Sequence, residues 1–124
     1  NLRVGQKITV AQGGFLAFIV KGNITIDPNL GNNPQSANRD DPNIQGFFLA
    51  DGTFDTQVGV STRERFVGKG IFKAGSFSFG RDLGSGANGN SRYAGEFFIY
   101  DPNLLLNSPP GLWVSSMSWL EVAP

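Results

Sequence analysis

The feature that most constrains the fold is a short pattern that recurs along the chain. Each copy has a Phe and an aliphatic residue, then a polar residue, a Gly or Pro, and a large apolar residue two positions further on. The copies span residues 18–24, 48–54, 66–72 and 98–104. Their bend positions are Gly22, Gly52, Gly70 and Pro102. Gly reaches backbone angles that cost other residues energy, and Pro fixes a bend, so each copy predicts a strand, a bend and a second strand.

The unequal intervals between the bends argue against a strict tandem array. They fit a parallel β-solenoid (β-helix) with variable loops at its corners and a C-terminal cap. Equivalent side chains of successive turns stack in such a fold, so we expect two ladders of side chains. The expected ladders are Phe18, Phe48, Phe66 and Phe98, and Ile24, Phe54, Phe72 and Leu104. Phe-rich strands with Gly bends also occur in a β-sandwich, which remains the alternative fold.

The composition predicts a single all-β domain over residues 1–124, long enough for one modest core. Eleven Phe, against one Met and two Trp, favour aromatic packing on strands, while 17 Gly and 7 Pro supply turns. No segment has a sustained helical period of apolar residues. Because the first residue is Asn rather than Met, we interpret the chain as a fragment or mature C-terminal piece of a longer protein.

The charge pattern and the missing residue types exclude several classes of function. The chain has ten basic residues (Lys and Arg) and ten acidic residues (Asp and Glu). It contains no run of basic residues, which argues against binding to nucleic acid or to an anionic membrane. No apolar stretch is long enough for a membrane span. The absence of Cys and His excludes disulfides, Ser-His-Asp and Cys-His catalysis, and zinc sites with nitrogen or sulfur ligands.

Polar stretches at residues 28–43, 57–65 and 83–94 predict loops, which would form a binding surface if the fold gathers them on one side. The C-terminal segment 112–124 is too apolar for a solvated end. We expect it to fold back as a terminal strand or cap that covers an open edge.

Carboxylates are the remaining candidates for catalysis. Asp51 and Asp101 occupy the same position of the repeat as Lys21 and Lys69. If these four residues stack in one solvent-facing column, their charges alternate, and their role would be to stabilise the fold rather than to catalyse a reaction. A glycan-cleaving groove is the functional alternative, since glycoside hydrolysis needs two neighbouring carboxyl groups. The acidic residues available for it are Asp51, Asp55, Asp82, Glu96 and Asp101.

Weaker ligand signals lie in the loops and near the end of the chain. Asp40, Asp41 and Asn43 offer oxygen ligands for calcium, the one cofactor left open, although Arg39 beside them favours a solvated turn. Tyr93, Trp113 and Trp119 would stack on sugar rings if exposed and otherwise belong to the core or cap. Asp27 and Asp101 each precede a Pro and predict Asx turns rather than metal sites.

Several stretches resemble one group of proteins: residues 44–52, 66–70, 80–83, 96–100 and 119–124. They are similar to the C-terminal domains of large, uncharacterised bacterial cell-surface proteins, some of which have pilin-like N-termini. The resemblance covers about residues 15–124 and implies an extracellular β-solenoid at the end of a longer protein. It brings no activity that can be assigned to particular residues.

We therefore expect a non-enzymatic, extracellular structural or adhesion module of a bacterial surface or pilus-associated protein. Its partners would be other surface or pilus proteins or a cell-surface glycan. One alternative is a carbohydrate-active β-helix enzyme that uses Asp or Glu. A second is a filament subunit that assembles through its edge strands.

Overall fold

The computed structural model describes residues 1–57, 63–86 and 89–112, and this part of the chain is mostly β-structure. The strands are β1 (Leu2–Val4), β2 (Ala17–Val20), β3 (Ile24–Ile26), β4 (Ile44–Asp55), β5 (Phe66–Ser78) and β6 (Glu96–Tyr100). A short helix α1 (Asn103–Leu106) and a 3-10 turn η1 (Pro110–Leu112) follow, which the sequence pattern did not predict. The helix begins directly after Pro102, whose fixed φ of −65° suits a helix start.

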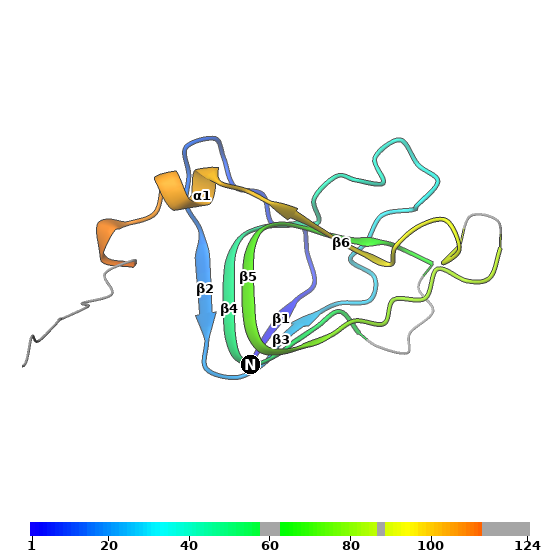
Figure 1. The fold of residues 1–124 in the computed structure, drawn as a ribbon, viewed down its shortest axis with the longest axis horizontal. Coiled ribbons are helices and arrows are strands. Elements are labelled where there is room, and N and C mark those ends of the chain that lie inside the picture. Colours follow the sequence, from blue (N-terminus) through cyan, green and yellow to red (C-terminus); the bar gives the residue numbers. More distant parts are fainter. Residues whose placement is uncertain (58–62, 87–88, 113–124) are drawn as a thin grey trace, which may run out of the picture.

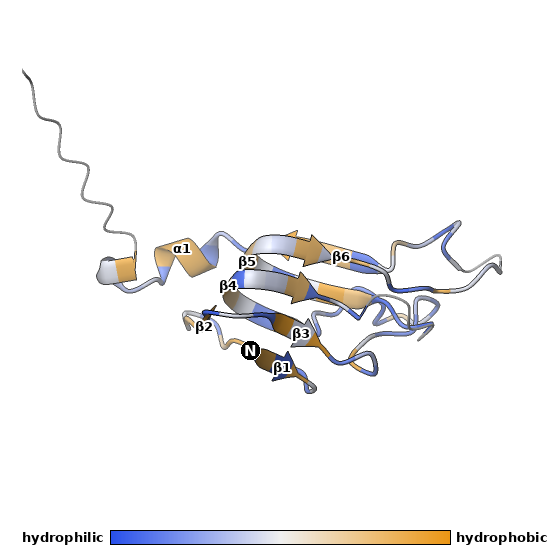
Figure 2. Cartoon of the chain, turned by 90° about the horizontal axis from the view of Figure 1, so that it is seen from below, coloured by the Kyte–Doolittle hydropathy of each residue, from blue (hydrophilic) through white to orange (hydrophobic). Residues whose placement is uncertain are grey.

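All the named strands belong to one six-stranded sheet, and every pairing between them is parallel. The strand β4 bends, so that its first half pairs with β2 and its second half with β3. Figure 1 shows β4 and β5 following the same curve, and Figure 2 shows the strands as layers from β1 to β6. The described residues do not form the two facing antiparallel sheets that the β-sandwich alternative requires.

Two pairs of glycines mark where the ribbons bend. Gly46 and Gly70 are register partners in β4 and β5, and their φ angles of 137° and 143° lie in the left-handed region. A Cβ atom at Gly70 would overlap the carbonyl oxygen of Gly46, so no larger residue fits there. At the other bend, the Gly52 amide donates to the Gly22 carbonyl oxygen at 3.1 Å. The sequence prediction correctly placed Gly22 beside Gly52, but Gly70 belongs to a different bend.

The predicted aromatic ladder is correct in its first step and wrong afterwards. Phe18 and Phe48 are register partners, with ring centroids 5.2 Å apart. Phe72, not Phe66, stacks next on Phe48 at 5.3 Å. Phe66 pairs instead with Glu96, and its ring contacts Phe98 edge-on at 5.7 Å.

The second expected ladder is also correct in its first step, from Ile24 to Phe54, and wrong afterwards. The register runs Leu2, Ile24, Phe54 and Phe77, without Phe72 or Leu104. A register shift between Ala50 and Thr53 leaves the bend of β5 one residue shorter than that of β4. Because the third copy begins at Phe72 and is shortened, its spacing no longer matches the pattern from which the ladders were predicted.

The core lies inside the bend of the sheet. Its fully buried large side chains are Ile24, Ile26, Ile44, Phe48, Phe54 and Phe66. The inward-facing side chains of successive strands contact one another, so each added strand removes further apolar surface of its neighbour from water. Neither helical segment of the described chain has the length and apolar character that a bilayer-spanning helix needs. The predicted strand or cap at 112–124 lies outside the described residues from Trp113 onward.

Candidate functional site

The loops that connect β3 to β4, β4 to β5 and β5 to β6 extend to the same side of the sheet (Figure 1). We call their described residues the loop surface. It comprises 27–43 from the first loop, 56–57 and 63–65 from the second, and 79–86 and 89–95 from the third. Because successive strands follow the same curve, segments inserted at the same corner leave the sheet together. The predicted loops 28–43, 57–65 and 83–94 therefore gather in one place, as far as they are described.

Backbone and amide groups connect the first two loops. The amides of Asn32 and Arg65 each donate to the carbonyl oxygen of the other residue, both at 2.8 Å. The Asn43 side chain donates to Asn32 Oδ1 at 2.9 Å, and its own Oδ1 accepts from the Val67 amide at 2.7 Å. Asn43 is buried, so these bonds replace the water that its amide would otherwise need.

Arg81 connects the third loop to the other two. Its guanidinium donates to the carbonyl oxygens of Asp27 at 3.0 Å and Pro28 at 3.4 Å in the first loop. It also donates to those of Thr56 at 3.3 Å and Glu64 at 3.4 Å in the second. The side chain is 5 % exposed. A guanidinium with several donors in a fixed plane can satisfy this many carbonyl groups at once.

The charge of Arg81 is balanced by carboxylates around it. Burial lowers the pKa of the guanidinium, while Glu96, Glu64 and Asp27 act in the opposite direction. Glu96 Oε1 also accepts hydrogen bonds from Thr56 Oγ1 at 2.7 Å and from the Arg81 amide at 3.0 Å. The Glu96 carboxylate therefore anchors the start of the third loop to the end of β4.

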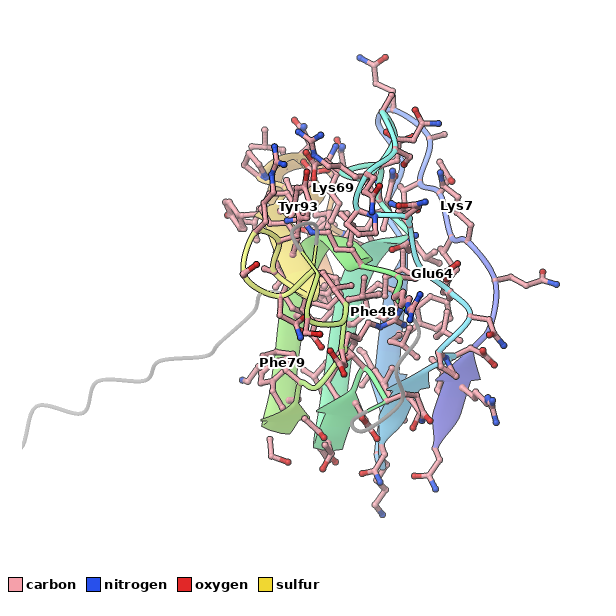
Figure 3. All side chains as sticks on the ribbon, turned by 90° about the vertical axis from the view of Figure 1, so that its right-hand side faces the viewer. Lys7, Phe48, Glu64, Lys69, Phe79 and Tyr93 are labelled. Carbon is pink, nitrogen blue, oxygen red and sulfur yellow. The ribbon has the colours of Figure 1, made fainter. Side chains whose placement is uncertain are left out.

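A polar hollow of about 540 Å³ lies between the three loops. Its lining includes Asn33, Gln35, Arg63, Glu64, Leu83 and Ser85. Figure 3 looks at this side of the molecule, with Glu64 on the second loop and Tyr93 on the third. A volume of this size suits a small ligand or part of a larger one, and the amide, hydroxyl and guanidinium groups would contact it through hydrogen bonds.

The predicted sugar-stacking residues are only partly described. Tyr93 is half-buried, with the guanidinium carbons of Arg39 and Arg92 at 5.9 and 5.5 Å from its ring centroid. These cations cover the ring and tie the third loop to the first. Trp113 and Trp119 lie outside the described residues, so their role stays a prediction.

The calcium candidates have partners within the protein. Asp40 forms ion pairs with Arg65 and, at 3.6 Å, with Arg39. The backbone oxygen of Asp41 accepts from Asn32 Nδ2 at 2.6 Å, and Asn43 makes the buried bonds described above. No group of three or more acidic side chains that could share a metal occurs in the part of the chain the structure describes. The contacts give these residues a structural role, and calcium binding stays a prediction.

The candidate catalytic carboxylates serve local hydrogen bonds. Asp82 Oδ1 accepts from the Gly84 amide at 2.8 Å and from Asn90 Nδ2 at 2.6 Å, and these bonds lower the pKa of Asp82. Asp55 Oδ1 accepts from the Gln57 amide at 2.8 Å. A general acid in glycan cleavage needs a raised pKa, which is the opposite of the shift at Asp82.

Asp101 forms the predicted Asx turn, and so does Asp27. The Asn103 amide donates to Asp101 Oδ1 at 3.1 Å, and the Asn29 amide donates to Asp27 Oδ1 at 2.9 Å. Desolvation of Asp101 works against ionisation, but the Asn103 amide and Lys69 outweigh it and lower the pKa of Asp101. Both carboxylates therefore stabilise turns.

The predicted column of alternating charges is wrong for Lys69. This residue pairs with Gln45 and Ile99 in the sheet, so it lies at the bend of Gly46 and Gly70 rather than beside Asp51. Its amine does contact Asp101 Oδ2, at 3.3 Å. The opposite charges meet, but through a different register from the one expected.

These features define a mostly β protein with a largely parallel six-stranded sheet that presents its connecting loops on one side. Comparisons with protein-family models, curated proteins and solved structures found no match for this chain.

The residues that hold the loop surface together, above all Arg81 and Arg65, do not stand out in the sequence. Both are charged residues next to an apolar strand: Arg65 precedes Phe66, and Arg81 follows the alternating Ser and Phe residues that end at Phe79. An isolated Arg at a strand end is a weak signal, because most such residues are solvated. Only their burial in the fold distinguishes these two residues from solvated arginines: Arg65 is 9 % exposed and Arg81 is 5 % exposed.

Proposed function

We propose that this chain is a non-enzymatic structural and adhesion module on the outer surface of a bacterium. Its sheet would be a short parallel β-solenoid, with β4 and β5 as bent turns of one continuous coil. The in-register stacking of Phe18, Phe48 and Phe72 supports this interpretation, as does the repetition of both bends from one turn to the next.

The observation that carries the adhesion role is the attachment of all three loops to one another through Arg81. A surface whose loops are already ordered loses less conformational entropy when it binds a ligand. Loops that served only as connections would gain little from a buried arginine, whose desolvation costs free energy. The loop surface is therefore the part of the molecule best prepared to bind a partner.

The chemistry of the hollow favours a cell-surface glycan as the partner. Gln35 and Ser85 line it and are exposed, and Arg63 adds a cation beside them. Amide, hydroxyl and guanidinium groups match the hydroxyl and carboxylate groups of sugars, and Tyr93 lies on the same side of the molecule. A surface or pilus protein is the second class of partner.

A glycan array followed by titration calorimetry would test this role. Gln35→Ala and Ser85→Ala each remove a hydrogen-bonding group from the hollow, and we expect each to weaken binding about 5- to 10-fold. Gln12→Ala is the matched control, since Gln12 is exposed and lies outside the loop surface. Equal affinities for all three variants, or no glycan bound on the array, would contradict the proposal.

The filament alternative draws support from the sheet, because β5 has an unpaired edge beyond Gly70 among the described residues. Assembly would join this edge to that of β1 or β2 in another copy. Light scattering over a range of protein concentrations separates the two functions, since a filament subunit grows in mass with concentration and a monomeric adhesion module does not.

A further inference from the structure

A second polar hollow lies at the corner of the sheet that is remote from the loop surface. Figure 1 shows α1 and the segment between β1 and β2 at this corner, with the three loops on the other side of the molecule. The hollow has a volume of about 500 Å³. Its lining comes from the segments 9–14 and 101–107 and from the bend of the sheet at Gly46. We call it the corner hollow.

The sheet contributes two long polar side chains to this lining. Gln45 of β4 and Lys69 of β5 are register partners, so they lie next to each other at the bend. The Val10 amide donates to Gln45 Oε1 at 3.0 Å. Because this bond fixes the orientation of the Gln45 amide, its Nε2 group keeps two donors for a partner outside the protein.

The segment that leaves β6 contributes an acceptor beside these donors. Lys69 Nζ lies 3.3 Å from Asp101 Oδ2, and the two side chains are 36 % and 18 % exposed. The other oxygen, Asp101 Oδ1, accepts from Asn103 Nδ2 at 3.1 Å, which leaves Asn103 Oδ1 as a further acceptor. The contact with Asp101 uses one of the three donors of the ammonium group. The polar groups of the corner hollow are therefore oriented by the protein before any ligand arrives.

The charges of the corner hollow select for a neutral ligand. Among the described residues that line it, only Lys69 and Asp101 are charged, and their charges cancel. An anion attracted by one of them would be repelled by the other, and the same holds for a cation. A hydroxyl group both donates and accepts, so it can bond to the ion pair without separating it. The Thr9 hydroxyl and the Asn107 amide add groups that also donate and accept.

We propose that the corner hollow is a binding site for a neutral sugar residue. Its volume lies within the range of about 300–1,000 Å³ that is typical of small-molecule sites. Gly13, with a φ of 76°, leaves its backbone bare in the lining, since a Cβ there would meet no atom within 4 Å. The described lining has no aromatic ring for stacking, so the affinity is millimolar. The site is separate from the hollow between the loops and does not depend on its function.

Nuclear magnetic resonance titration of the full chain tests this site. The probes are the methyl glycosides of glucose, galactose, mannose and N-acetylglucosamine, and methyl glucuronide and methyl glucosaminide provide the charged comparison. At least one neutral glycoside should shift the signals of the Gln45 side-chain amide and of the Gly13 amide. The amides of Gly84 and Gly86 report on the hollow between the loops, so the two sites succeed or fail separately.

Three variants show whether the shifts come from the corner hollow. Lys69→Met removes the ammonium group, and Thr9→Val removes an exposed hydroxyl with little change of shape. We expect each to weaken binding about 5-fold or more. Lys73→Met is the matched control, because Lys73 is an exposed lysine of the same strand outside the hollow, and it should bind as the native chain does.

Three results would overturn the proposal. The first is unchanged Gln45 and Gly13 signals with all four neutral glycosides at about 100 mM. The second is binding of the charged glycosides alone, which would contradict the neutral class of ligand. The third is the same affinity in Lys69→Met and Thr9→Val as in Lys73→Met.

Discussion

Arg81 shows how a single side chain can organise a surface made of distant segments. Its guanidinium reaches the carbonyl oxygens of Asp27 and Thr56, which belong to different loops. The ring of Phe66 lies 5.5 Å from the guanidinium carbon and shields it from water. Each bond alone is modest, but together they fix loops that the sheet by itself would leave independent.

We expect Arg81→Met to destabilise the protein by about 3 kcal/mol, since it keeps much of the side-chain volume but leaves buried carbonyl groups without donors. Urea unfolding followed by circular dichroism measures this. Arg3→Met is the control, because Arg3 is an exposed partner of Asp27 and its loss should cost below about 1 kcal/mol. Equal losses in both variants would show that Arg81 is no more than a surface residue.

Phe48 is the matching residue in the core. It has no exposed surface and lies between the rings of Phe18 and Phe72. Phe48→Ala should cost about 3–5 kcal/mol of unfolding free energy, because it leaves a cavity in the aromatic ladder. Tyr93→Ala, in the half-buried loop position, should cost far less in the same denaturation experiment. A loss below about 1 kcal/mol for Phe48→Ala would contradict the stacking.

Among the elements, β4 and β5 decide the register through their paired glycines. A Cβ atom at residue 70 would overlap the Gly46 carbonyl, and a φ of 143° is strained for any side chain. We expect Gly70→Ala to cost more than about 2 kcal/mol. Gly86→Ala is the control, because a Cβ there meets no atom within 4 Å. Thermal unfolding of the two variants should separate clearly, and similar midpoints would rule out the close approach at this bend.

At the scale of the whole molecule, three lowered aspartate pKa values predict an acid-sensitive fold. The Asn29 amide and then Arg3 lower the pKa of Asp27; the Gly84 amide and Asn90 lower that of Asp82. Desolvation opposes the shift at Asp101, where the Asn103 amide and Lys69 prevail. A carboxyl group whose pKa is lowered in the folded state stabilises the fold at pH values above its ordinary pKa of 3.8. That stabilisation is lost as the pH falls through the pKa of the folded state.

The thermal midpoint should therefore stay level above about pH 5 and fall below the ordinary aspartate value. The triple variant Asp27→Asn, Asp82→Asn, Asp101→Asn keeps an oxygen acceptor at each turn but removes the titrating group. Differential scanning calorimetry should show a weaker fall at low pH for this variant. A pH profile as steep as that of the native chain would mean that other carboxylates cause the acid sensitivity.

The sequence by itself determined much of the local structure of this protein, although not the helix α1, which stands where the fourth copy of the repeat predicted a strand after Pro102. Phe-rich runs interrupted by glycine specified strands with bends, and the close contact of Gly22 and Gly52 agrees with the pattern. Asp before Pro specified the Asx turns at Asp27 and Asp101, since a side chain that bonds its own backbone needs no distant partner. The positions of the polar loops followed from composition alone.

Only the tertiary structure decided which residues of successive strands meet. Phe66 and Phe72 each belong to a short apolar pair beside a glycine, Phe66 before Gly68 and Phe72 after Gly70, so hydropathy could not choose between them as the partner of Phe48. The choice depends on the close approach of Gly46 and Gly70 and on the shortened bend of β5, which are contacts between segments far apart in the chain. The same reason hid Arg81: its importance comes from burial among three loops, and burial is a property of the assembled fold.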